Sequence, residues 1–293
     1  MEVKALKFGG LTAKRPIVQG GMGVGVSLSS LAGNVAKCGG VGTISGVHPG
    51  YREADFKENP FRANLRAIGN ELEKAKEIAN GGIIGFNFMT VMNHYEEYVK
   101  EAIAAGADFI VSGAGLPVNL AKYAAGTRAA ILPIVSSARA LKLIVKQWQR
   151  ADRLPDAVVV EGPLAGGHLG YPYGHLVDGT FDTLEDSLVD VVDYVRELEE
   201  KSGVKIPVIA GGGVRNHADM ERLMALGASG VQVGTKFVAT EECDAAPAFK
   251  QAYLRSRKED VQLIESPVPP FSLQCTEPMR FHPPMPPDRI SNQ

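Results

Sequence analysis

The stretch Val158-Val-Val-Glu-Gly-Pro-Leu-Ala-Gly-Gly-His-Leu-Gly170 joins an apolar run to a glycine-rich turn that holds one histidine. The apolar run, which starts at Ala157, predicts a strand buried on both faces, as a parallel sheet requires. Gly166 and Gly167 carry no Cβ atom, so a flat ligand or a phosphate group could approach their backbone closely. His168 follows at the C-terminal end of the strand, where α/β barrels carry their chemistry. The stretch therefore indicates either an active-site histidine or a tight strand-to-helix turn.

Eight strand-like runs alternate with eight helical segments along the chain. Strands are expected at 16–18, 41–44, 83–87, 109–111, 131–135, 157–160, 206–210 and 230–233. Helices are expected at 27–37, 68–79, 93–105, from 117 onward, and at 138–149, 183–201, 217–226 and 241–257, with Ser27 capping the first of them. A doubly wound open sheet usually has only about five or six strands. The alternation therefore predicts an α/β fold in which one parallel sheet closes as a (β/α)8 TIM barrel.

The chain length supports one barrel with a tail. A barrel typically needs ~250 residues, and this chain has 293. Eight of the 18 prolines follow Ser266, and periodicity is weak there. We expect a barrel domain at 1–258 and an irregular, proline-rich tail at 259–293 that could serve as a shortened lid.

Composition narrows the class of protein. The chain is 45% hydrophobic and 22% charged, which is typical of a soluble globular protein. A net charge of −2 gives no electrostatic footprint for nucleic acid or an anionic membrane. No apolar run reaches the ~20 residues of a membrane span. Three scattered cysteines favour a reducing cytoplasm, and no cluster has the spacing of metal ligands.

Glycine-rich turns follow the seventh and eighth expected strands. The first contains Gly211, Gly212 and Gly213, and the second contains Gly234 and Thr235. Barrels commonly bind phosphate at these two turns through backbone N–H groups and a helix N-terminus. Barrels also use glycine in such turns without any ligand. Two adjacent clusters favour the phosphate interpretation.

Polar side chains at other strand ends match a flat, phosphorylated cofactor. Gln19 and Asn87 end the first and third strands, and their amides could donate to and accept from the uracil-like edge of a flavin. Asn87 could equally cap a turn. Glu161 could bind a ribityl hydroxyl. No glycine fingerprint of a separate nicotinamide-binding domain follows any strand.

Five motifs together resemble the nitronate monooxygenases, formerly called 2-nitropropane dioxygenases. They are Pro16–Gly23, Gly85–Asn87, Glu161–Gly170, Ile206–Gly213 and Gly227–Phe237. The wider group includes the flavin-dependent enoyl-acyl carrier protein reductases, and the resemblance covers about residues 8–245. The Ala-Gly-Gly-His-x-Gly element and the Gly-Ala-x-x-Val-Gln-Val-Gly-Thr-x-Phe element are specific in combination.

The resemblance implies an FMN-binding barrel with His168 as the active-site histidine. It places the phosphate and the ring against residues that lie at the ends of the expected strands: Gln19, Gly20, Gly21, Met22, Asn87, Gly166, Gly167, Gly211, Gly212, Gly213, Gly234 and Thr235. Two features depart from the family pattern. Pro163-Leu164-Ala165 replaces the usual pair before Gly-Gly-His, and the region after the barrel is short and proline-rich.

Two enzymatic functions are compatible with these residues. The first is an FMN-dependent monooxygenase that oxidises alkyl nitronates with O2. The second is an NAD(P)H-dependent FMN reductase of enoyl-acyl carrier protein thioesters or quinones. A flavin-binding module without turnover is a third alternative, and a homodimer is left open. We expect a cytoplasmic enzyme that acts on small molecules, without a metal, a nucleic acid or a membrane as partner.

Overall fold

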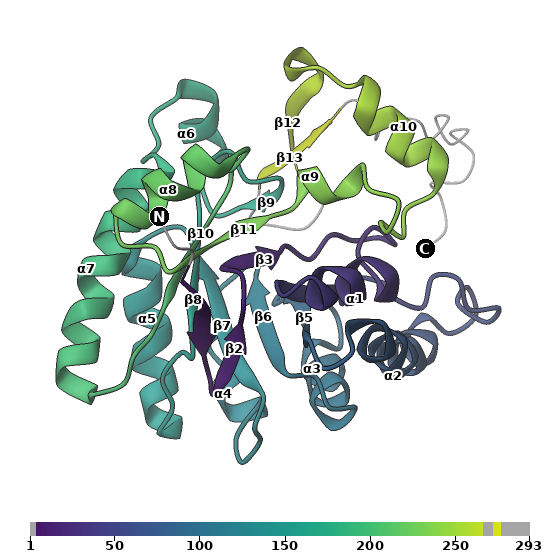
Figure 1. Ribbon diagram of the computed structural model, residues 1–293, viewed down its shortest axis with the longest axis horizontal. Helices are drawn as coiled ribbons and strands as arrows, with labels where there is room; N and C mark the ends of the chain where they lie inside the picture. The colour runs from purple at the N-terminus through teal and green to yellow at the C-terminus, as the bar shows by residue number, and fades with distance from the viewer. Residues whose placement is uncertain (1–3, 266–271, 277–293) are drawn as a thin grey trace.

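A closed barrel of eight parallel strands forms the centre of the computed structural model, which describes residues 4–265 and 272–276 (Figure 1). The strands follow one another around the barrel in the order β10-β11-β3-β4-β5-β6-β7-β8. Their bounds are β3 Ile17–Gln19, β4 Val41–Ser45, β5 Ile83–Met89, β6 Phe109–Gly113, β7 Ala130–Val135, β8 Val158–Glu161, β10 Val208–Gly211 and β11 Gly230–Val233. Each overlaps one expected strand, so the TIM-barrel prediction is confirmed.

Helices cover the outside of the barrel (Figure 1). Their bounds are α1 Ser29–Lys37, α2 Pro60–Ala79, α3 Tyr95–Ala104, α4 Leu120–Tyr123, α5 Ala138–Trp148, α6 Tyr173–Asp178, α7 Leu184–Ser202, α8 His217–Ala225, α9 Thr235–Val238 and α10 Pro247–Arg255. Helix α2 starts earlier than expected because Asn59 accepts a hydrogen bond from the Arg62 backbone N–H at 3.1 Å, with Pro60 in the first turn. The last expected helix, 241–257, is shorter in the structure, where it corresponds to α10, and the short helix α9 that precedes it was not expected.

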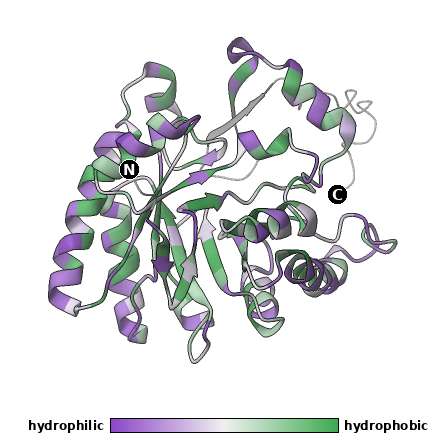
Figure 2. Ribbon diagram, viewed as in Figure 1, coloured by the Kyte–Doolittle hydropathy of each residue, from purple (hydrophilic) through white to green (hydrophobic). Residues whose placement is uncertain are grey.

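Two apolar layers hold the fold together. The barrel interior is filled by small and branched side chains, among them Val18, Val41, Leu132, Val159 and Ile209. A second layer lies between the strands and the helices, where α5 contributes its expected buried face of Leu141, Ile144, Val145 and Trp148. Figure 2 shows hydrophobic residues concentrated on the strands and hydrophilic residues on the outer faces of the helices. This pattern is the one that parallel strands buried on both faces require.

An N-terminal hairpin that the sequence analysis missed closes one end of the barrel. It pairs β1 Leu6–Phe8 with β2 Leu11–Ala13, and Leu6, Phe8 and Ala13 are buried with the barrel interior. At its turn, a Cβ atom on Gly9 would come within 2.6 Å of Ala130, the first residue of β7. The hairpin therefore lies at the N-terminal ends of the barrel strands.

A three-stranded sheet lies at the opposite end, with the order β12-β13-β9 (Figure 1). It joins β9 Gly167–Leu169 to β12 Val261–Glu265 and β13 Ser272–Thr276. The segment from 259 was expected to be irregular, but its described part contains both of these strands. Their pairing with β9 is non-local, which explains why the local pattern did not reveal it. Positions 266–271 and 277–293 of that segment lie outside the described residues. Within residues 4–265 and 272–276, no helix combines the length and the hydropathy needed to cross a membrane.

We predict that Phe8→Ala lowers the free energy of unfolding by about 3–5 kcal/mol, because it opens a cavity in the barrel interior. Phe8 is 3% exposed, and its ring meets that of Phe109 edge-on at 6.0 Å. Denaturant unfolding should show the loss. Lys7→Ala is the matched control, since Lys7 points to solvent from the same strand. Equal effects of the two substitutions would mean that the hairpin does not seal the core.

Candidate active site

The register of the barrel brings the predicted site residues of several strands to one end. Gly211 lies opposite Glu161 on β8 and opposite Gln232 on β11, and Val233 lies opposite Gln19 on β3. Asn87 lies opposite Ser45 on the adjacent pair of strands β5 and β4. Since all the strands run in the same direction, these residues lie at the C-terminal end of the barrel, where barrel enzymes carry their active sites.

Glu161 and Gln232 form a polar pair at this mouth. The Gln232 Nε2 atom donates to Glu161 Oε1 at 2.9 Å. Burial raises the pKa of the Glu161 carboxyl to about 7, and the hydrogen bond from Gln232 opposes that shift. Both protonation states of Glu161 are therefore populated near neutral pH. The sequence analysis did not select Gln232, although a polar residue inside the apolar run 230–233 was an available signal.

Gln19 lies behind the mouth rather than open to it. The residue is fully buried, its Oε1 atom accepts from the Thr43 backbone N–H at 3.0 Å, and its Nε2 atom donates to the Gly20 carbonyl at 2.5 Å. The amide that was expected to meet a flavin edge is thus bonded within the protein. It fixes the Gly20 peptide and links β3 to β4.

The loop after β3 connects two other predicted positions. A Cβ atom on Gly21 would collide with the Asn87 side chain, so only glycine fits there. A Cβ atom on Gly234 would lie 3.4 Å from the Met22 sulfur. The loop 20–22 is therefore in contact with β5 on one side and with the turn after β11 on the other.

The two glycine turns expected to bind phosphate end adjacent strands, β10 and β11. Gly212 and Gly213 both have positive φ angles, +101° and +78°, which glycine adopts at little cost. A Cβ atom on Gly212 would come within 2.9 Å of the Ala165 backbone nitrogen. Thr235, at the start of α9, is exposed. These turns present accessible backbone at the rim, and Gly212 also supports the turn that leads to β9.

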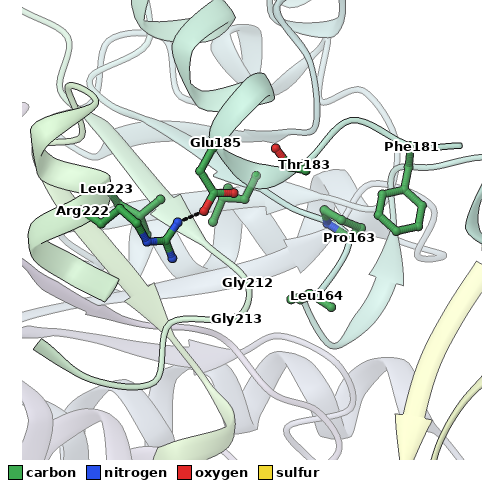
Figure 3. A pocket seen from close by; sticks show the side chains of 10 residues that line it. Pro163, Leu164, Phe181, Thr183, Glu185, Gly212, Gly213, Arg222 and Leu223 are labelled. Carbon is green, nitrogen blue, oxygen red and sulfur yellow. Dashed lines mark ion pairs between the residues drawn. The ribbon is translucent and has the colours of Figure 1, made fainter. Parts of the chain in front are cut away.

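A pocket of about 210 Å³ is lined in part by Gly212 and Gly213 of the turn after β10 (Figure 3). Arg222 forms an ion pair with Glu185 across it and lies 3.5 Å from an Asp219 carboxylate oxygen. The charge of Arg222 is therefore already balanced. The other lining residues are mainly apolar and come from the turn after β8, the start of α7 and α8: Pro163, Leu164, Phe181, Thr183, Leu184 and Leu223.

His168 lies on β9 instead of in a simple turn after β8. It is partly buried, and its partner in the antiparallel ladder is Leu273 of β13. Partial burial lowers the pKa of the His168 imidazole below its usual value, so the neutral form dominates at neutral pH. Among the described residues, no atom lies within 4 Å of the positions that Cβ atoms on Gly166 and Gly167 would take. The histidine thus follows two glycines whose Cβ positions no described atom approaches.

Known proteins resemble this chain in sequence and structure. It is 25% identical over 283 residues to a probable nitronate monooxygenase of Staphylococcus saprophyticus, covering 89% of this chain and 75% of that protein. It is 25% identical over 255 residues to an octahydro-indene-carboxyl-CoA dehydrogenase of Rhodococcus jostii, covering 84% of this chain and 58% of the relative. The structure of FabK from Thermotoga maritima has the same fold, with a TM-score of 0.70, 24% identity, and coverage of 90% of this chain and 71% of that one.

A family-wide comparison agrees with these pairwise similarities. The model of the nitronate monooxygenase family matches residues 4–272, which include the whole barrel and the strands β9 and β12. The chain therefore belongs to the nitronate monooxygenase family and is an oxidoreductase of that family.

Proposed function

We propose that this protein binds FMN at the barrel mouth and oxidises alkyl nitronates with O2. The observation that carries the proposal is His168, a partly buried histidine with a lowered pKa, placed beside the open backbone of Gly166 and Gly167. Membership of the nitronate monooxygenase family supports the same activity. The cofactor, the substrate and the residue roles below are part of this proposal.

The residues at the mouth fit a flavin mononucleotide. Gly213, Gly234 and Thr235 would hold its phosphate through backbone N–H groups and a hydroxyl. Gly21 packs directly against the Asn87 side chain, so the loop after β3 and Asn87 together would form one wall against which the flat ring lies. The remaining members of the proposed set are Gly20, Met22, Glu161, Gly166, Gly167, Gly211 and Gly212, with Gln19 fixing the Gly20 peptide from behind. When bound, FMN would supply the electron transfer and the reactivity toward O2.

His168 would manage the proton of the substrate. A neutral imidazole can accept the proton from the α-carbon of a nitroalkane. Once protonated, it can donate a hydrogen bond to an oxygen of the nitro group. The pairing of β9 with β13 would hold the imidazole ring of His168 in place for either task. Glu161, with a pKa of about 7, would bind a hydroxyl of the cofactor chain and can both donate and accept at neutral pH.

A second candidate function is NAD(P)H-dependent reduction on the same FMN site. The Rhodococcus relative is named as a dehydrogenase of a carboxyl-CoA compound, which is a thioester. His168 would then polarise a carbonyl group of an enoyl thioester or a quinone. The two functions differ in what reduces the flavin.

The decisive experiment separates these two functions by the reductant. The pigment of the purified protein is first released by heat and identified by mass, and we expect FMN. The intact protein is then mixed anaerobically with propionate 3-nitronate, NADH or NADPH while the flavin absorbance is followed. We expect bleaching by the nitronate and not by the nicotinamides. Bleaching by NADH or NADPH alone would establish the reductase, and absence of any flavin would refute both.

We predict that His168→Ala keeps its FMN but loses turnover by ~10²-fold or more with a neutral nitroalkane, because the proton acceptor is gone. The loss should be smaller with the anionic nitronate, which has no α-proton to remove. Steady-state rates on both substrates test this. His175→Ala, at an exposed histidine on α6, is the control. Unchanged rates of His168→Ala on every substrate would make His168 a bystander.

We also predict that Glu161 makes stability depend on pH. Its pKa is about 7 in the folded protein but about 4.3 in an unfolded chain. Between these values the folded protein binds more protons, so the free energy of unfolding falls as pH rises, by roughly 3–4 kcal/mol in all, and levels off above about pH 7.

Urea unfolding between about pH 4.5 and 8 should show that Glu161→Gln removes this slope. Glu73→Gln, at an exposed position on α2, should retain it. If the wild type and Glu161→Gln have parallel pH profiles, the carboxyl does not titrate in this range.

A further inference from the structure

The loop between β3 and α1 is closed on itself by Ser27. The Met22 backbone N–H donates to Ser27 Oγ at 2.8 Å, and the Ser27 backbone N–H donates to the Met22 carbonyl at 3.0 Å. The Ser45 backbone N–H holds the Ser27 carbonyl at 2.9 Å. Ser27 was expected to cap α1, but the structure uses it to shape this loop.

The cap of α1 comes from distant carboxylates instead. The position that a local cap would occupy is Leu28, which offers no side-chain acceptor. Asp244 Oδ2 accepts from the backbone N–H groups of Leu28 and Leu31 at 2.8 and 3.1 Å, and Asp244 Oδ1 accepts from Ser30 at 3.2 Å. Glu71 accepts from the fourth backbone N–H, that of Ser29, at 3.0 Å. A negative charge is favourable at a helix N-terminus, so α1 is anchored by Asp244 across 216 residues of sequence.

The segment around Asp244 is fixed to the same loop by further contacts. The Asp244 backbone N–H and the Cys243 thiol both donate to the Val26 carbonyl, at 3.2 and 3.3 Å. From the solvent side, Arg52 donates to the Asp244 carbonyl at 2.7 Å. Val26, Cys243 and Val238 are buried together, and Met22 packs against them. The loop and the segment that follows α9 therefore form one rigid unit.

This unit joins two parts of the proposed cofactor site. The loop carries Gly20–Met22, which would face the ring, and α9 begins at Gly234–Thr235, which would face the phosphate. Between these parts, the Met22 sulfur is 3.4 Å from the Cβ position of Gly234. A group that fixes the loop to the segment after α9 therefore also fixes the distance between the two ends of the site.

We propose that Asp244 is a positioning residue for the cofactor: its carboxylate holds the ring-facing loop at the correct distance from the phosphate-facing turn. This inference rests on the proposed binding of FMN. Asp244 itself lies behind the loop, bonded to the backbone of α1, and does not act on substrate. Its influence on the reaction passes through Gly20–Met22.

The test is Asp244→Asn in the full-length protein. Asparagine keeps the size but replaces one oxygen with an amide NH2 that would face backbone N–H groups. We expect the dissociation constant for FMN to rise ~10- to 100-fold, as when groups that orient a ligand set are removed. Fluorescence titration of the apoprotein with FMN measures it. The visible absorption bands of bound FMN should also change shape, because the ring-facing loop loses the anchor that the Asp244 carboxylate provides through α1.

The matched control is Asp156→Asn at the opposite end of the barrel. Asp156 also accepts from a backbone N–H, that of Ile131 at 2.9 Å, but it lies beside the N-terminal hairpin. The Asp156→Asn substitution should reduce the free energy of unfolding without changing the affinity for FMN or the spectrum of bound FMN. Arg52→Ala is a milder variant at an exposed side chain, for use if Asp244→Asn does not fold. It should weaken FMN binding less than Asp244→Asn and change the bands in the same direction.

Two results would overturn the inference. The first is that Asp244→Asn binds FMN with the affinity and the spectrum of the wild type. If Asp244→Asn does not fold, the same result in Arg52→Ala overturns the inference. The other is an equal loss of affinity in Asp156→Asn at matched stability, which would make the effect a general consequence of destabilisation. If the wild-type protein binds no FMN, the proposed function fails instead, so the two failures are distinguishable.

Discussion

The hydrogen-bonded closure of eight parallel strands is the constraint on which the rest of the molecule depends. Closure satisfies every strand edge and points all the carboxyl ends the same way. Residues distant in sequence, such as Glu161, Gly211 and Gln232, are thereby brought to one rim. The interior below this rim is filled by apolar side chains, and the hairpin β1–β2 covers the other end. Among the described residues, the polar candidate site residues therefore gather at the C-terminal mouth.

Polar side chains at the mouth differ in how their hydrogen-bonding groups are satisfied. The Gln19 amide is fully buried and bonded to the Thr43 and Gly20 peptides, so it serves the architecture of the rim. The Glu161 carboxyl accepts a hydrogen bond from Gln232, and burial raises its pKa to about 7. Burying a carboxyl group is unfavourable unless it is well compensated. An incompletely compensated acid at a barrel mouth is characteristic of a functional site.

The mouth is completed by segments that do not belong to the barrel. Strand β9 carries His168 and forms a sheet with β12 and β13 from the C-terminal part of the chain. The loop after β3 is held by Asp244, which follows α9. In both cases a segment from the C-terminal part of the chain holds a segment that comes before it in the sequence. The arrangement makes the geometry of the site a property of the whole fold.

The sequence alone determined the eight strands, most helices, the glycine turns and the place of His168 after β8. These features follow from local patterns: the period of apolar residues and the turn preferences of glycine and proline act within a few residues. The tertiary structure alone decided that Gln19 is buried, that Gln232 partners Glu161, that Ser27 closes a loop and that Asp244 caps α1. It also decided that the N-terminal hairpin closes one end of the barrel and that β9 pairs with β13. The Ser27 loop is closed by the nearby Met22, but its carbonyl is held by Ser45 of β4. The other features depend on contacts between residues far apart in the chain, whose partners become neighbours only once the barrel has closed.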